Sequence, residues 1–182
     1  MTVIVVSVGT DHHRFDRLTG WLTAWRASHP DVQLVVQHGT SSPVADARNS
    51  ELLPHPELME WFRAADAVVL QGGPGGVMDA RANGVLPIVV PRDPEFGEHV
   101  DGHQLDFSAH LADRGLARVV TDRTALTGLL DATVAGTESW RIDPSTEAPA
   151  GVRAVRDLLV QPPTRRPDGT WRRLWRVWGR RA

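Results

Sequence analysis

Residues 65–80 read ADAVVLQGGPGGVMDA, and this stretch decides the fold class of the chain. The apolar run 67–70 predicts a short strand buried on both faces, because it shows no alternation of apolar and polar residues. Four glycines follow within residues 72–76, and a helical pattern begins behind them at about residue 77. A buried strand that passes through glycines into a helix is typical of α/β folds with a parallel sheet.

The same alternation extends in both directions from this stretch. Further apolar runs predict four more short strands, at residues 3–8, 32–37, 86–90 and 117–120. Helical patterns lie at residues 15–25, 57–65, 77–82, 103–114 and 124–134, whereas the turn-rich residues 40–54 stay unassigned. We therefore predict an α/β fold, with a single Rossmann-like domain over residues 1–160 and a mostly parallel sheet covered on both faces. Ligands of such sheets bind beyond the carboxyl ends of the strands, so the expected site comprises the loops 9–13, 71–76 and 91–104.

The composition narrows the possible chemistry. The 182 residues suffice for one domain with its own core. There is no cysteine, which excludes disulfides and thiolate metal sites, and all 20 basic residues are arginine, which excludes a phosphate-loop or Schiff-base lysine. Residues 1–160 carry a net charge of −8 and residues 161–182 one of +6. The acidic body argues against nucleic acid as a partner.

The glycine-rich segment has the features of a phosphate site that needs no lysine. Its glycines let the backbone approach a ligand closely, and the helix behind them presents free N–H groups and a partial positive charge. Asp79 lies about one turn into that helix, where its carboxylate could accept hydrogen bonds from ribose hydroxyls. The alternative is a tight strand-to-helix turn in which Asp79 only interacts favourably with the helix dipole.

A second polar segment covers residues 87–104. His103 and Gln104 stand at a predicted helix start, where they could point at sugar hydroxyls. His99 and His103 are four residues apart, a spacing that raises a metal site as a possibility, but Gly102 between them disfavours the helical pairing of two ligands. A solvated polar loop is the other reading of this segment.

The loop after the first strand reads Gly9-Thr10-Asp11-His12-His13. An Asp-His-His triplet also occurs in a manganese phosphoesterase superfamily, whose further metal-binding aspartates lie upstream. Residues 1–10 contain no aspartate, so we reject that assignment. Gly9 and Thr10 are instead expected to approach a ligand across the cleft, while His12 and His13 either face the cleft or are exposed loop residues.

The sequence of residues 161–182 predicts a proline-rich linker and a basic amphipathic tail. Trp171, Leu174, Trp175 and Trp178 fall on one face of a helix, and arginines fill the rest. Tryptophan with arginine predicts a helix that lies on a membrane surface or docks on a membrane partner. A helix docked on the acidic body and a disordered tail are the alternatives. No stretch approaches the ~20 apolar residues of a membrane span.

Together, these segments resemble the C-terminal, donor-binding domain of family 28 glycosyltransferases. The resemblance covers about residues 2–135 and rests on the stretches VSVGT (6–10), ADAVVLQGGPGGVMDARANGVLPIVVPR (65–92) and GEHVDGHQ (97–104). It implies a fold equivalent to the C-terminal half of a GT-B glycosyltransferase. The nearer likeness is to free-standing copies of this domain, which work as one subunit beside a membrane-bound partner that supplies the acceptor domain.

By position, the resemblance implies a donor-binding role for twelve residues. The glycines of 72–76 hold the diphosphate, Asp79 matches an acidic ribose ligand, and Gln104 matches a glutamine that contacts the donor sugar. The full set comprises Gly9, Thr10, Gln71, Gly72, Gly73, Gly75, Gly76, Asp79, Arg92, Glu98, His103 and Gln104. The chain departs from the family at Gln71, where histidine is usual, and at Gly76, where threonine or serine is common.

The resemblance implies an inverting transfer of a sugar from a UDP donor to a lipid-linked acceptor in polysaccharide or glycan synthesis, without a metal or other cofactor. The general base would belong to the partner, and His12 and His13 are the candidates within this chain. The expected location is cytoplasmic, at the inner face of the membrane. Two alternatives stay open. One is a non-catalytic subunit that senses UDP-sugar or scaffolds a membrane complex, and the other is a one-domain enzyme of another Rossmann-like class.

Overall fold

The computed structural model describes residues 1–144, which form six short strands and five α-helices. Strands and helices alternate along the chain, except that β3 follows β2 directly. The strands are β1 (Val3–Ser7), β2 (Gln33–Gln37), β3 (Arg48–Ser50), β4 (Ala67–Gln71), β5 (Ile88–Val90) and β6 (Arg118–Val119). The helices are α1 (Asp16–Arg26), α2 (His55–Ala64), α3 (Pro74–Ala82), α4 (His103–Asp113) and α5 (Arg123–Val134), with a 3-10 turn at Pro94–Phe96.

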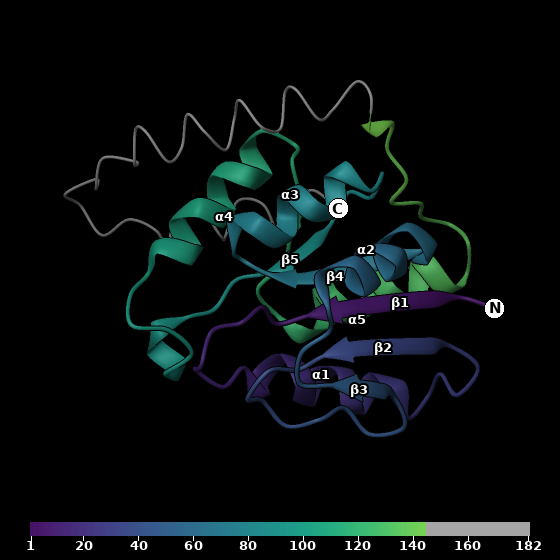
Figure 1. Cartoon of the computed structure of the whole chain (residues 1–182), viewed down its shortest axis with the longest axis horizontal. Helices are drawn as coiled ribbons and strands as arrows, with labels where there is room; N and C mark the ends of the chain where they lie inside the picture. The colour runs from purple at the N-terminus through teal and green to yellow at the C-terminus, as the bar shows by residue number, and fades with distance from the viewer. Residues whose placement is uncertain (145–182) are drawn as a thin grey trace.

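The strands form one sheet in the order β3-β2-β1-β4-β5-β6, and every pairing between them is parallel (Figure 1). This arrangement confirms the predicted α/β fold. The strand order runs one way from β1 to β2 and the other way from β4 to β5, so it reverses between β1 and β4. Open parallel sheets bind ligands at such a reversal, beyond the carboxyl ends of the strands.

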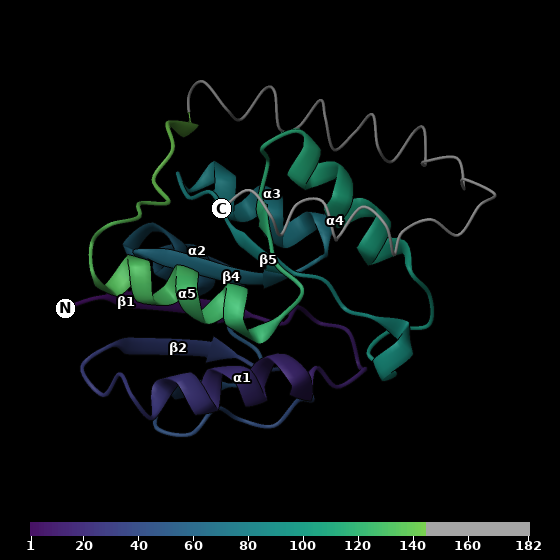
Figure 2. The same ribbon diagram turned by 180° about the vertical axis from the view of Figure 1, so that it is seen from behind.

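Helices cover both faces of the sheet. Helices α1 and α5 lie on one face and α2 lies on the other (Figures 1 and 2). The indole Nε1 of Trp25 on α1 donates to Asp131 Oδ1 on α5 at 2.6 Å, which joins the two helices. The central strands are buried on both sides, as their continuous apolar runs predict, and Ile4, Val68 and Ile88 have no exposed surface.

Two local features differ from the sequence predictions. Strand β3 lies within residues 40–54, which we left unassigned, because an edge strand of sequence RNS carries no apolar signal. Helix α3 begins at Pro74 rather than at about residue 77. Proline suits a first helical position, since its missing N–H would have no partner there. Gly75 and Gly76 therefore belong to the first turn of the helix and not to a loop.

Asp122→Ala is expected to lower the free energy of unfolding by about 1 kcal/mol, because Asp122 is the N-cap of α5. Its side chain accepts a hydrogen bond from the Ala125 backbone N–H at 2.8 Å. Thermal denaturation should show a melting temperature about 2–4 °C lower. Asp31→Ala, at an exposed turn residue, is the matched control. Equal melting temperatures for the two variants would contradict the capping role.

Candidate functional site

Three loops meet at the carboxyl edge of the sheet, next to the reversal of strand order. They are residues 8–15 after β1, residues 72–73 after β4 and residues 91–102 after β5. The structure thus brings together the three loops that the sequence predicted as the site. Arg92, at the start of the third loop, donates from Nη2 to the Val8 carbonyl at 3.0 Å and from Nη1 to the His13 carbonyl at 2.7 Å, which ties that loop to the first one.

The side chain of Gln71, at the end of β4, lies between two glycines. A Cβ atom at Gly9 would overlap Gln71 Nε2, and one at Gly73 would stand 2.6 Å from the same atom. Gly9 also has a φ of +76°, which disfavours any other residue. Gln71 Oε1 accepts a hydrogen bond from Gln104 Nε2 at 2.8 Å. Two predicted donor-binding side chains, from β4 and α4, are therefore in direct contact.

The first turn of α3 is open to a ligand. Its N-cap residue, Gly73, makes no side-chain capping bond, and a Cβ atom at the exposed Gly75 would meet nothing within 4 Å. Gly72 is closely packed instead, because a Cβ atom there would stand 2.7 Å from Ser108 Oγ of α4. Helix N-termini with free N–H groups attract anions, and phosphate above all. The glycines therefore divide into packing positions and an open first turn of the kind that suits an anion.

Asp79 has a partner that the sequence did not indicate. Its Oδ2 lies 3.2 Å from Nε2 of His55, at the first position of α2, and both side chains are partly exposed. Only the packing of α2 beside α3 brings these two residues together, and no motif links positions so far apart in the sequence. The pair places an imidazole beside the carboxylate that the sequence predicted as a ribose ligand.

Arg92 and Glu98 occupy positions that do not suit direct contact with a ligand. Arg92 has no exposed surface, and Nη1 also donates to the Glu98 backbone carbonyl at 3.1 Å. Glu98 is 3% exposed, and its carboxylate accepts two hydrogen bonds from Arg17, at 2.8 and 2.7 Å. We predicted both as donor-binding residues, but the structure makes them internal supports of the loops. Nothing in the sequence indicated that these two charged residues of a polar loop would be buried.

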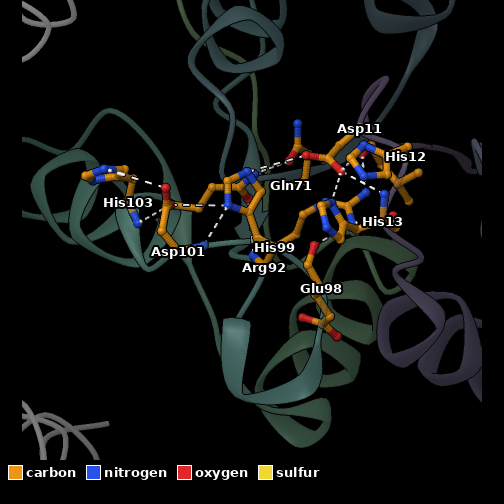
Figure 3. A network of polar contacts seen from close by, with 11 residues as sticks. Asp11, His12, His13, Gln71, Arg92, Glu98, His99, Asp101 and His103 are labelled. Atoms are coloured by element: carbon orange, nitrogen blue, oxygen red, sulfur yellow. Dashed lines mark hydrogen bonds and ion pairs between the residues drawn. The ribbon is translucent and has the colours of Figure 1, made fainter.

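Imidazoles and carboxylates form a continuous network across the first and third loops (Figure 3). Asp11 Oδ1 lies 2.7 Å from His13 Nδ1, and Asp11 Oδ2 lies 3.4 Å from His99 Nε2. Asp101 contacts His99 Nδ1 at 3.2 Å and His103 Nε2 at 3.7 Å. Burial by itself raises the pKa of Asp11, but hydrogen bonds from His13 and the charge of Arg92 outweigh it and leave that pKa below its ordinary value.

The remaining predicted residues lie at the rim. Thr10 is exposed, and the side chains of His12 and His103 are 84% and 85% exposed. His13 is more enclosed, at 23%, and its ring lies 4.0 Å from that of His12. Of the two candidate bases, His13 is therefore the one held in place by neighbours. None of the helices within residues 1–144 is both long enough and apolar enough to cross a membrane.

A family model links this geometry to known proteins. The model described as glycosyltransferase family 28 C-terminal domain matches residues 3–149. A second model, described as Mago binding, matches residues 160–178, which lie outside the described residues together with the predicted tail. No curated protein matches the chain.

Solved structures of glycosyltransferases resemble the chain, and three of them are compared with it. They are a glycotransferase of kitacinnamycin (23% identity, TM-score 0.53), the calicheamicin glycosyltransferase CalG4 (18%, 0.52) and the glycosyltransferase SnogD from Streptomyces nogalater (19%, 0.50). The matches cover 87%, 87% and 89% of this chain, but only 39%, 38% and 40% of the respective structures. The chain thus has the fold of about two fifths of each structure, and at these identities the similarity shows the fold alone.

Proposed function

The chain belongs to the family of glycosyltransferase family 28 C-terminal domains, and we propose that it binds the UDP-sugar donor of a sugar-transfer reaction. The observation that carries the proposal is the open first turn of α3. Its N-terminus is uncapped by side chains, it follows β4 through two glycines, and it lies where the strand order reverses. A diphosphate is the ligand that suits such a turn in a chain without lysine.

In this proposal the parts of the donor are distributed over the three loops. The diphosphate lies on the backbone N–H groups at the start of α3, and the ribose hydroxyls donate to the carboxylate of Asp79. The sugar lies toward Gln104 and His103 at the start of α4. The side chain of Gln71 lies between Gly9 and Gly73 and is hydrogen-bonded to Gln104.

The chemical role that follows is electrostatic. When the bond between the sugar and the diphosphate breaks, negative charge grows on the leaving group. Fixed N–H groups and a helix dipole stabilise that charge without reorganisation and without a metal ion at the diphosphate. Inversion at the sugar carbon requires a base that accepts the proton of the acceptor hydroxyl. We assign that base to a partner subunit, with the more enclosed His13 as the candidate within this chain.

We further propose that a membrane-bound partner supplies the acceptor-binding domain and that the acceptor is lipid-linked. The resemblance to free-standing donor-binding subunits supports this part, together with the Trp/Arg pattern of residues 161–182, which lie outside the described residues. A peripheral location at the inner face of the membrane belongs to the same proposal.

A non-catalytic, UDP-sugar-sensing or scaffolding subunit is the second candidate. Gln71 favours it, because a carboxamide engaged with Gln104 carries no charge toward the diphosphate. Both candidates bind the donor, so binding alone does not separate them. The two candidates are separated by the rate of sugar transfer in the reconstituted complex. If Asp79→Ala and Gln104→Ala leave this rate unchanged, the catalytic proposal fails and the second candidate stands.

We expect the purified chain to bind UDP equally well with and without EDTA in calorimetry, and Asp79→Ala to weaken that binding by about 10- to 100-fold. The loss corresponds to one hydrogen bond to a charged group, which is worth about 1.5–3 kcal/mol. Asp113→Ala, on the exposed end of α4, is the control and should bind as the parent does. Absence of UDP binding, or equal affinity in Asp79→Ala, would contradict the proposed site.

A further inference from the structure

The carboxylate of Asp11 is surrounded by three imidazoles (Figure 3). His13 Nδ1 lies 2.7 Å and His12 Nδ1 lies 3.8 Å from Oδ1, while His99 Nε2 lies 3.4 Å from Oδ2. One ligand atom each from Asp11, His12 and His13 lie within 4.8 Å of one another. His99 comes from the opposite loop, after β5. His99 Nε2 thus adjoins the carboxylate of this three-residue group from a segment about 90 residues later in the sequence.

We propose that Asp11, His12 and His13, completed by His99, bind a divalent transition-metal ion of the zinc type. Three imidazole nitrogens and one carboxylate oxygen are a donor set that suits Zn²⁺, Co²⁺ or Ni²⁺, whereas Mg²⁺ prefers oxygen alone. The site is separate from the first turn of α3. An ion bound to His13 would prevent that residue from acting as a base, which leaves the base to the partner subunit. The inference goes beyond donor binding and does not depend on it.

The surroundings of His99 support a metal ligand. Metal-bound histidines generally donate their second ring N–H to a carboxylate, which fixes the tautomer. His99 turns Nε2 toward Asp11, and its Nδ1 lies 3.2 Å from Asp101 Oδ1. The Asp101 backbone N–H also lies 3.3 Å from Nδ1, so both tautomers of His99 have a partner. A bound ion selects the tautomer with the proton on Nδ1.

The nearby charges favour a cation, and the loop backbone is already fixed. Asp11 and Asp101 oppose one buried cation, Arg92, while Arg17 and Glu98 neutralise each other in a 2.7 Å ion pair. Arg92 also holds the His13 carbonyl at 2.7 Å, which limits the movement of the first loop. Because the ligands come from both loops, a bound ion would join the first loop to the third.

The test is calorimetry of the 182-residue chain, first stripped of metal with a chelator and then titrated with ZnCl₂, CoCl₂ or MgCl₂. We expect one Zn²⁺ or Co²⁺ ion per chain and no Mg²⁺ binding. We expect weaker Zn²⁺ binding, by about tenfold or more, in each of the variants Asp11→Asn, His13→Gln and His99→Gln. Even the mutation of residues that only hydrogen-bond to metal ligands typically weakens metal binding by about tenfold or more. His110→Gln is the control, because His110 lies on α4 with Nδ1 beside the Asp106 carbonyl, outside the network of Asp11 and Asp101, and should leave the affinity unchanged.

His12→Gln keeps the test decisive if a more enclosed variant fails to fold, because the His12 side chain is 84% exposed. It should also weaken Zn²⁺ binding. At about a hundredfold excess over Kd, Zn²⁺ should raise the melting temperature of the parent chain by about 5–10 °C. The proposal is overturned if Zn²⁺ does not bind, or if it binds with equal affinity in His12→Gln and the other ligand variants. UDP binding in EDTA is measured separately, so failure here leaves the donor site untouched.

Discussion

Gly75→Ala is expected to weaken UDP binding by about tenfold or more without lowering the melting temperature. The added methyl group enters open space at the first turn of α3, because nothing lies within 4 Å of a Cβ atom there. It would instead occupy the space through which a phosphate reaches the backbone N–H groups. Alanine is favoured over glycine in helices by about 0.8–1.0 kcal/mol at interior positions, so the fold itself should not suffer.

Gly128→Ala is the matched control for this experiment. Gly128 lies within α5, and a Cβ atom there also meets nothing within 4 Å. This variant should gain stability by a similar mechanism and bind UDP as the parent chain does. Calorimetry and thermal denaturation of both variants separate binding from stability. Unchanged UDP affinity in Gly75→Ala would place the diphosphate elsewhere, even if the chain binds UDP.

Arg92→Met is expected to lower the free energy of unfolding by about 3 kcal/mol or more, the largest loss of stability that we predict. Methionine keeps much of the side-chain length but removes donors to three carbonyls, those of Val8, His13 and Glu98. Each buried acceptor left without a donor costs about 1–3 kcal/mol. The melting temperature should therefore fall by about 6–12 °C.

Arg114→Met provides the comparison for Arg92→Met, since Arg114 is exposed at the end of α4. Its melting temperature should stay within about 2 °C of the parent value, because exposed substitutions are usually worth less than 0.5 kcal/mol. Similar losses in the two variants would mean that the buried guanidinium does not hold the loops together. In Arg92→Met we also expect weaker UDP binding, because the loops after β1 and β5 lose their connection.

The sequence predicted those parts of the fold that leave an apolar signal. The buried runs at β1, β2, β4 and β5 were recognisable because both faces of each strand are covered. Strand β6 was recognisable from the buried Ala117 and Val120 that flank it. Strand β3 was not, since Arg48–Ser50 pairs only at the edge of the sheet and presents polar side chains. The family resemblance stated from the sequence is confirmed by the family model over residues 3–149.

Only some features of the candidate site could likewise be predicted from the sequence. The glycine-rich stretch could be found in the sequence, because close backbone approach demands glycine and little else does. The burial of Arg92 could not, since an arginine in a polar loop is most often exposed. The pairing of His55 with Asp79 depends on two helices that pack side by side. Nothing in the sequence near either residue predicts this contact.

The histidines show the difference between what the sequence predicts and what only the tertiary structure decides. From the sequence, His99 and His103 were the pair to weigh as metal ligands, because they are four residues apart. The structure turns His99 toward Asp11, on a loop almost 90 residues earlier, and leaves His103 exposed. The sequence by itself determined the order of the helices and of the strands other than β3, and also the glycine-rich turn, because residue type governs local burial and backbone geometry. Only the tertiary structure decided which side chains meet at the edge of the sheet, because those distances follow from the order in which the strands pair.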